Sequence, residues 1–424
     1  MKINKWTLGL AAVGLVSLSS VAQAEETSVP LMTALSSTVI SGYVDASAVW
    51  NPGTGNANPA PVSFNAGKQD GFNLNVVNLT LEKPLDEGTW SAGYKVELLF
   101  GPDAVGYNPS ANSGTFIPGT AGTPASNGPG LDGLPNTADD VVNPATAGTP
   151  SRTTGNQSDF GIKQAYIALR APVGNGLDLK LGVFDTPIGY ESFVGYRNPN
   201  YTRSYGYTIE PTQHTGVLAS YQFSDIIGVS AGIANTLSPG INSRSPRGES
   251  SKAYMGSITL TAPQSMGALA GSALYAGIVD GFAGNPSDDQ TSYYLGATIA
   301  TPVAGLRFGA AYDHASNLGA GGYASAIALY ASFQASEKVS FHARAEYAKL
   351  GGDKITALTG TVQYDLWQNV ISRLEIRWDH SQNSNFGGTS AGPRDQDPLS
   401  STFNPNGAHK KNEVMIAANL VYKF

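Results

Sequence analysis

Hydrophobic and polar residues alternate along most of the chain with a period of two, the period of a β-strand. In the segment 90–100, Trp90 and Tyr94 lie on one face and Lys95 on the other. The segments 339–347, 373–379 and 414–424 alternate in the same way. Several segments run for about ten residues, as strands that cross a membrane do. Strands of soluble proteins usually have about five or six.

Sixteen such segments are predicted, and the connections between them alternate in length. The segments begin near residues 38, 70, 88, 159, 176, 214, 226, 251, 269, 290, 304, 322, 338, 354, 369 and 410. The alternation slips in phase near Val76 within the second segment. Short turns on one side and longer loops on the other are typical of an outer-membrane barrel. The predicted fold is therefore all-β, a single transmembrane antiparallel β-barrel of about 16 strands, with short periplasmic turns and long extracellular loops.

Composition narrows the function classes. Charged residues make up 13% of the chain, the formal net charge is −7, and there is no Cys. A chain with this charge and no long Lys/Arg run is not expected to bind nucleic acid. Without Cys it has no disulfide and no thiol nucleophile. It also lacks a Gly-x-Ser-x-Gly motif and its five His are widely spread, so we do not expect an enzyme.

The first residues have the features of a targeting segment. Lys2 and Lys5 precede the apolar run 8–18, and Ala22-Gln23-Ala24 forms a cleavage site. We predict a signal peptide over 1–24 for Sec export, a short linker over 25–37, and a barrel domain over 38–424. The insertion 101–158 is rich in Gly, Pro, Thr and Ala. Such a segment buries little apolar surface, so it is predicted to be a mobile external loop.

Four segments resemble one family of bacterial outer-membrane proteins. They are Gln164–Pro172 (QAYIALRAP), Gly182–Glu191 (GVFDTPIGYE), Asn198–Tyr207 (NPNYTRSYGY) and His214–Phe223 (HTGVLASYQF). Together they are similar to the OmpL-like group of β-barrel porins, and the resemblance runs from about residue 38 to 424. It implies a pore-forming barrel. The terminal Phe424 resembles the signal that the barrel assembly machinery reads.

Candidate pore residues come from alternation and from one loop. In general porins the loop after the fifth strand folds into the pore, and loop 185–213 has that position here. Its charged residues are Asp185, Glu191, Arg197, Arg203 and Glu210, and the charged wall residues considered with them are Lys95, Glu97, Lys180, Arg344, Glu346, Arg373 and Arg377. These charges either create a transverse field that sorts solutes or pair into a structural ladder. Both roles stay open.

The same loop carries many aromatic residues. They are Tyr190, Phe193, Tyr196, Tyr201, Tyr205 and Tyr207. Aromatic rings could stack on sugar solutes. The interpretation we favour is that they pack the loop against the wall.

No resident cofactor is expected, with one metal site considered. Asp132, Asn136, Asp139 and Asp140 lie around a Gly turn in the insertion. Oxygen ligands of this kind could hold Ca²⁺. The EF-hand spacing is missing, so an acidic solvated turn is the favoured interpretation.

The predicted function is passive diffusion of small hydrophilic solutes or ions through a water-filled porin in the outer membrane of a Gram-negative-type bacterium. The expected partners are outer-membrane lipid, the barrel assembly machinery through Phe424, the solutes themselves and two further copies in a homotrimer. Two alternatives remain: a non-conducting barrel that acts as a surface receptor or adhesin, and a sheath for a partner protein.

Overall fold

A computed structural model provides the coordinates. It describes residues 37–56, 58–60, 70–86, 88–107, 126–128, 141–143, 160–237, 240–248, 250–283, 289–318, 322–388, 396, 400 and 404–424. The predicted signal peptide, most of the linker and most of the insertion lie outside these residues. In the described part, no helix has the length and apolar character needed to cross a membrane.

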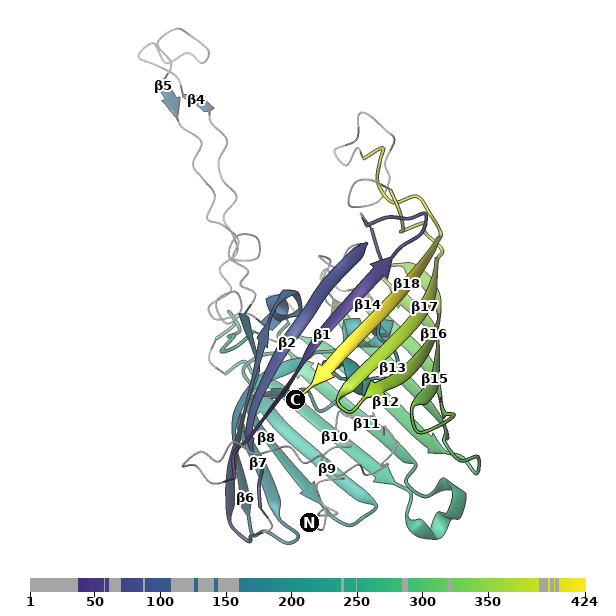
Figure 1. The fold of residues 1–424 in the computed structure, drawn as a ribbon. Coiled ribbons are helices and arrows are strands. Elements are labelled where there is room, and N and C mark those ends of the chain that lie inside the picture. The colour runs from purple at the N-terminus through teal and green to yellow at the C-terminus, as the bar shows by residue number, and fades with distance from the viewer. Residues whose placement is uncertain are drawn as a thin grey trace.

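Sixteen described strands form one closed antiparallel barrel (Figure 1). Each pairs with its neighbour along the chain, and β1 pairs with β18 to close the cylinder. The strands are β1 (Val39–Trp50), β2 (Gly71–Lys83), β3 (Ser91–Phe100), β6 (Phe160–Ala171), β7 (Leu177–Asp185), β8 (Gln213–Gln222), β9 (Ile227–Ala234), β10 (Ala253–Thr261), β11 (Ala273–Gly281), β12 (Gln290–Ala300), β13 (Leu306–Leu318), β14 (Gly322–Gln334), β15 (Val339–Leu350), β16 (Asp353–Trp367), β17 (Val370–Ser381) and β18 (Asn412–Lys423). The predicted fold is confirmed. β4 (Ser126–Gly128) and β5 (Val141–Asn143) pair only with each other.

Alternation sets the two faces of the wall as expected. On β15 and β16, Tyr347 and Leu358 face outward and are well exposed, whereas Arg344 and Glu346 face inward and are buried. The phase slip in the second segment is a β-bulge, because Asp45 pairs with Val76 while the next residue, Ala46, pairs with Leu74. The extra residue, Asn75, turns its amide inward and donates to Asp45 Oδ1 at 2.7 Å.

Two connections illustrate departures from the predicted pattern of short periplasmic turns and longer extracellular loops. β15 and β16 are joined at the extracellular end by Gly351 and Gly352 alone, both with positive φ (53° and 89°). Glycine allows so tight a turn because it tolerates left-handed backbone conformations. At the periplasmic end, the β10–β11 connection is longer than predicted because it contains the 3₁₀ helix η3 (Gln264–Leu269).

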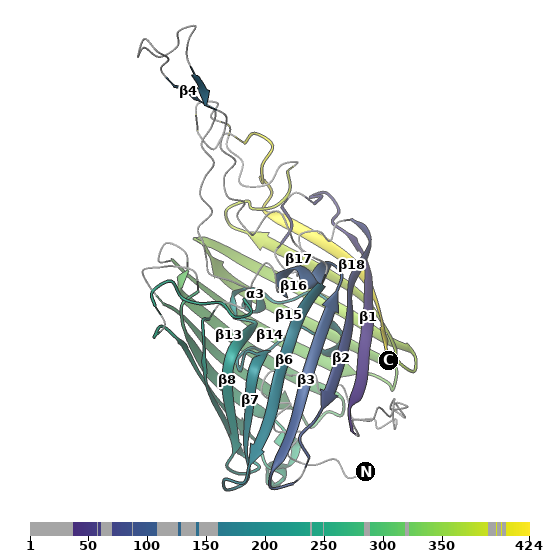
Figure 2. The ribbon, with the colours of Figure 1, turned by 90° about the vertical axis from the view of Figure 1, so that its left-hand side faces the viewer.

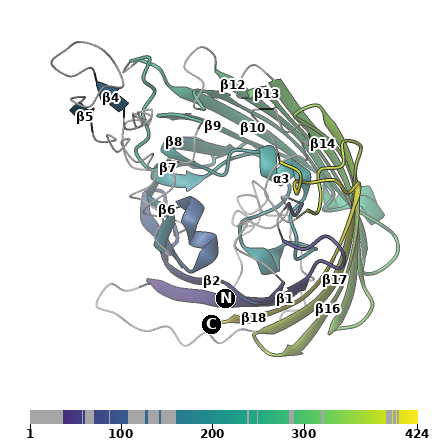
Figure 3. The same cartoon turned by 90° about the horizontal axis from the view of Figure 1, so that it is seen from above.

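Two segments from the extracellular side enter the barrel (Figures 2 and 3). One is the 3₁₀ helix η1 (Pro102–Tyr107), at the start of the insertion. The other is the connection between β7 and β8, residues 186–212, called the inner loop from here on. It contains η2 (Gly195–Arg197) and α3 (Tyr205–Ile209), and α3 contacts β13, β14 and β15.

The closing seam is tight at one glycine. Gly42 exchanges two backbone hydrogen bonds with Phe424, each 3.0 Å long. A Cβ at Gly42 would lie 2.2 Å from the backbone oxygen of Asn78 and 2.6 Å from the Phe424 ring. We therefore expect Gly42→Val to oppose closure at a cost of about 1–3 kcal/mol, typical of overpacking.

The measurement is the yield of heat-modifiable barrel on refolding in detergent. Gly360→Val is the matched control, since the nearest atom to a Cβ at Gly360 is a side-chain carbon of Ile376 at 3.9 Å. Equal yields for the two variants would show that the seam tolerates the added side chain.

Candidate functional site

The inner loop is held against the wall by arginines that come from β15 and β17. Arg344 donates to Glu191 Oε1 at 2.8 Å and to Glu346 Oε2 at 2.7 Å. The same guanidinium donates to the carbonyl oxygens of Thr202 and Arg203 at 2.8 and 3.1 Å. Arg344 is only 1% exposed. A charge so deeply buried is tolerated because carboxylates and carbonyl dipoles surround it.

A second arginine repeats this arrangement two strands away. Arg377 is fully buried and is paired with Asp379 at 2.9 Å and with Glu346 at 3.2 Å. It also donates to the carbonyl oxygen of Arg203 at 2.9 Å. Asp379 in turn accepts a hydrogen bond from the hydroxyl of Tyr205 at 2.8 Å. Wall and loop therefore share one hydrogen-bonded charge cluster.

Carboxylates of the wall and of the loop itself accept hydrogen bonds from the backbone N–H groups of the loop. Glu375 accepts from the amides of Tyr201 and Thr202 at 2.6 and 2.9 Å. Glu346 accepts from the amide of Tyr205 at 2.7 Å, and Glu191 accepts from that of Ser204 at 2.7 Å. Unpaired backbone groups away from water are costly, and these contacts replace the hydrogen bonds that secondary structure would supply.

Arg373 anchors the next part of the loop. Its guanidinium donates to the carbonyl oxygens of Gly195, Tyr196 and Asn198 at 2.8–2.9 Å. The inner loop is thus fastened along most of its length by inward side chains of β15 and β17.

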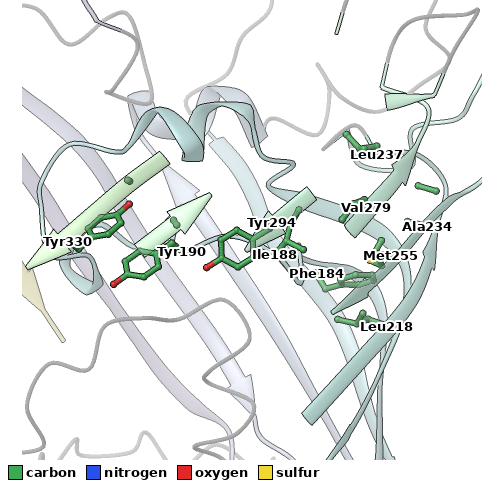
Figure 4. Packing of buried hydrophobic residues seen from close by; sticks show 13 residues of the cluster. Phe184, Ile188, Tyr190, Leu218, Ala234, Leu237, Met255, Val279, Tyr294 and Tyr330 are labelled. Atoms are coloured by element: carbon green, nitrogen blue, oxygen red, sulfur yellow. The ribbon is translucent and has the colours of Figure 1, made fainter. Parts of the chain in front are cut away.

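An apolar cluster fixes the first arm of the loop (Figure 4). Ile188 and Tyr190 pack against inward residues of β8 to β14, and the rings of Tyr190 and Tyr330 stack with centroids 4.1 Å apart. A Cβ at Gly309 would lie 1.8 Å from the Tyr190 hydroxyl, and one at Gly277 would lie 2.4 Å from Ile188. Small residues in the wall therefore make room for the loop.

The helix η1 packs against the inner loop at Phe193. Tyr107 meets Phe193 edge to face, with ring centroids 5.0 Å apart, and both are buried. Lys163 lies over both rings and forms an ion pair with Asp185. The start of the insertion, predicted to be mobile, is part of the packed interior over residues 102–107. The remainder of the 101–158 prediction lies almost wholly outside the described residues.

The predicted site residues separate into two groups. Glu97, Glu191, Arg203, Arg344, Glu346, Arg373 and Arg377 are buried, and Arg344, Arg373 and Arg377 are bonded to the inner loop. Lys95, Lys180, Asp185, Arg197 and Glu210 are partly exposed. The aromatic rings of the loop are mostly engaged in packing, as favoured from the sequence. Tyr196, for example, meets Tyr43 edge to face at 5.1 Å.

Three inner cations, two partly exposed and one exposed, have no carboxylate within ion-pair distance among the described residues. Lys180 lies 4.9 Å from the centroid of the Tyr166 ring, Arg197 lies over the ring of Tyr196, and Arg307 is exposed at the periplasmic end of β13. Lys95 is 4.0 Å from Glu82 and 3.9 Å from Glu97. These four cations keep part of their side chains exposed, whereas the arginines of the charge cluster are buried.

One carboxyl pair was not identified from the sequence. Glu210 at the end of the inner loop is hydrogen-bonded to Asp313 on β13, and a Cβ at Gly206 would lie 2.1 Å from Asp313 Oδ2. Loss of water around the Glu210 carboxyl, together with the charge of Asp313, raises the pKa of Glu210 well above its ordinary value. The two residues lie about one hundred positions apart, so no local pattern could reveal their contact.

The metal prediction is not addressed by the coordinates. Asp132, Asn136, Asp139 and Asp140 all lie outside the described residues. Within the described part, no cluster of three or more His, Asp or Glu side chains is arranged to hold a metal ion.

Comparison with known proteins shows that the chain matches a family of β-barrel porins. Residues 37–404 match the family profile described as "Putative beta-barrel porin-2, OmpL-like". No relative was found among proteins with curated descriptions.

Solved structures share the fold at low sequence identity. An anion-selective porin from Comamonas acidovorans is similar with a TM-score of 0.53, at 12% identity, over 92% of this chain and 99% of that chain. The outer membrane channel DcaP of Acinetobacter baumannii has a TM-score of 0.52, at 11% identity, over 91% and 97%. Salmonella typhi OmpF in complex with daunomycin has a TM-score of 0.52, at 10% identity, over 91% and 97%. These likenesses show the fold alone.

The arginine cluster makes a direct prediction about stability. Arg344→Met keeps an aliphatic side chain but leaves Glu191 and Glu346 without one of their cations. Breaking a buried ion pair on one side costs about 3–5 kcal/mol, so we expect a lower thermal midpoint and proteolytic cleavage within the inner loop. Arg307→Met, at an exposed inner position without an ion pair, should match the wild type. An uncleaved loop in Arg344→Met would contradict the anchoring role.

The carboxyl pair predicts a pH dependence. The pKa of Glu210 is higher in the folded protein than in the unfolded chain. Between these two pKa values, only the folded protein keeps the proton on Glu210. The free energy of unfolding therefore falls as the pH rises through this range. Glu210→Gln cannot ionise, and its thermal midpoint should decline less between pH 5 and pH 8. Melting curves in detergent at several pH values provide the test. Parallel curves for the two proteins would refute it.

Proposed function

Because the chain belongs to the OmpL-like β-barrel porin family, we propose that it is a non-enzymatic channel through which small hydrophilic solutes and ions diffuse passively across the bacterial outer membrane. A sixteen-stranded barrel is too wide for side chains of the wall to fill. In this proposal the inner loop narrows the lumen, and solutes pass through the space that it leaves.

The observation that carries the proposal is the fixed position of the inner loop. A loop bound to the wall by buried charges cannot swing across the lumen without breaking several charge-assisted hydrogen bonds. A constriction of constant size is what a passive size filter requires. A plugged receptor would instead need the loop to be released before anything could pass.

We propose further that the lumen prefers anions. Asp185 is neutralised by Lys163, and Glu82 and Glu97 lie near Lys95. Lys180, Arg197 and Arg307 lack such partners among the described residues, so these three side chains can offer positive charge to an anion. Charges that line a pore tune ion selectivity.

Two expectations about partners follow from the sequence and are kept as proposals. One is a homotrimer. The other is recognition of the terminal strand by the barrel assembly machinery through Phe424, which follows export by the Sec route.

Single-channel recording in a planar bilayer under a KCl gradient tests the function. We expect steady, stepwise conductance. We also expect a non-zero reversal potential whose sign shows that chloride passes more readily than potassium. Lys180→Glu should shift the reversal potential toward cation preference, while Lys338→Glu in an exposed periplasmic turn should leave it unchanged. A silent but correctly folded barrel would overturn the channel proposal, and an unshifted potential in Lys180→Glu would overturn the role of that side chain.

A further inference from the structure

Two lysines face the lipid at the extracellular end of neighbouring strands. Lys349 on β15 and Lys354 on β16 are direct cross-strand partners. They share the outer face with Tyr347 and Leu358, which are 42% and 52% exposed. β15, β16 and β17 lie side by side in the wall (Figure 1).

The pairing of like charges is unfavourable within the protein itself. Charges of one sign placed directly opposite each other destabilise a sheet, and neither lysine has an ion-pair partner among the described residues. The nearest acid in sequence, Asp353, faces inward and accepts hydrogen bonds from Ser381 and Asn385 at 2.6 and 2.7 Å. Among the described residues, no carboxylate supplies a counter-charge to either lysine, so both are open to an anion from outside.

The outer face around these lysines offers donors and no carboxylate. Outward positions of the described strands β13 to β18 contain no Asp or Glu. Ser325 is the cross-strand neighbour of Lys349 on β14, and Thr356 pairs with His380 on β17. We call Lys349, Lys354, Thr356 and His380 the rim patch.

The surroundings of the rim patch have the layering of a lipid site. Tyr347 pairs with Thr356 at the lower edge of the patch, and Leu358 pairs with Trp378 one step further into the wall. The indole of Trp378 stacks on His380 with centroids 5.9 Å apart. Aromatic residues occupy the level where head groups meet acyl chains, so cations directly above them are at head-group height.

The patch is confined to one sector and one end of the barrel. Among the described strands, the only other Lys or Arg that faces outward is Lys83, at the periplasmic end of β2. The extracellular ends of β1 and β2 present Trp50 and Phe72 instead. A general need for solubility at the rim would not concentrate the charge in this way.

We propose that the rim patch binds the phosphorylated head group of an outer-leaflet glycolipid, with the phosphate between Lys349 and Lys354 and acyl chains along Leu358 and Trp378. Interfacial lysines attract anionic lipids, and a phosphate removes the repulsion between the two ammonium groups. The site lies on the outside of the wall, so it does not depend on what passes through the lumen.

Native mass spectrometry of the detergent-purified full chain with added bis-phosphorylated lipid A tests the proposal. Lys349→Gln/Lys354→Gln should lower the affinity by roughly tenfold or more, the effect expected for two interfacial cations. Lys83→Gln, the outward lysine at the other end, should bind as the wild type does, and Lys349→Arg/Lys354→Arg should retain binding. Dephosphorylated lipid A should bind the wild type no better than it binds the double Gln variant.

Three results would overturn the proposal. They are equal binding by the wild type and the double Gln variant, equal binding of phosphorylated and dephosphorylated lipid A, and disulfide-linked dimers of Lys349→Cys, which would mean that a second copy covers the patch. Every variant is first shown to be heat-modifiable, so a folding failure is recognised. Conductance of the double Gln variant should equal that of the wild type, which separates failure of this site from failure of the channel proposal.

Discussion

The ion cluster around Arg344 and Arg377 is the interaction on which the interior depends. Both guanidinium groups are out of contact with solvent, and both donate to the backbone carbonyl of Arg203. A buried charge that lost its partners would be very costly. Wall and inner loop are therefore stable together, and neither half of the cluster is satisfied without the other.

This mutual dependence explains how a barrel with so wide a lumen acquires a defined interior. The wall supplies charges at alternate positions of β15 and β17, and the inner loop supplies carbonyls, amides and one carboxylate, Glu191. Apolar packing also holds the loop in place, with Tyr190 against Tyr330 on one side and Phe193 against Tyr107 on the other. The charges that stay partly exposed, such as Lys180, lie outside this attachment.

Much of this could be predicted from the sequence because β-strand alternation is a strict rule. The sixteen strands, the bulge near Val76 and the inward direction of Arg344 and Glu346 all follow from a period of two. Alternation tells which face a residue lies on, but not whether a loop covers that face. The division between buried arginines and the partly exposed Lys180 was therefore left open. The prediction of a mobile external loop was wrong over η1, and the contact between Glu210 and Asp313 was missed, because both depend on distant residues.

The central claim is that the inner loop is a permanent part of the wall. Hydrogen exchange of the folded protein in lipid tests it most directly, through the amides of Tyr201, Thr202, Ser204 and Tyr205, which donate to Glu375, Glu191 and Glu346. The account predicts that these four amides exchange as slowly as amides in the centre of β15 and β16. Exchange at the rate of an exposed loop would show that the loop leaves the wall, and would contradict the fixed constriction.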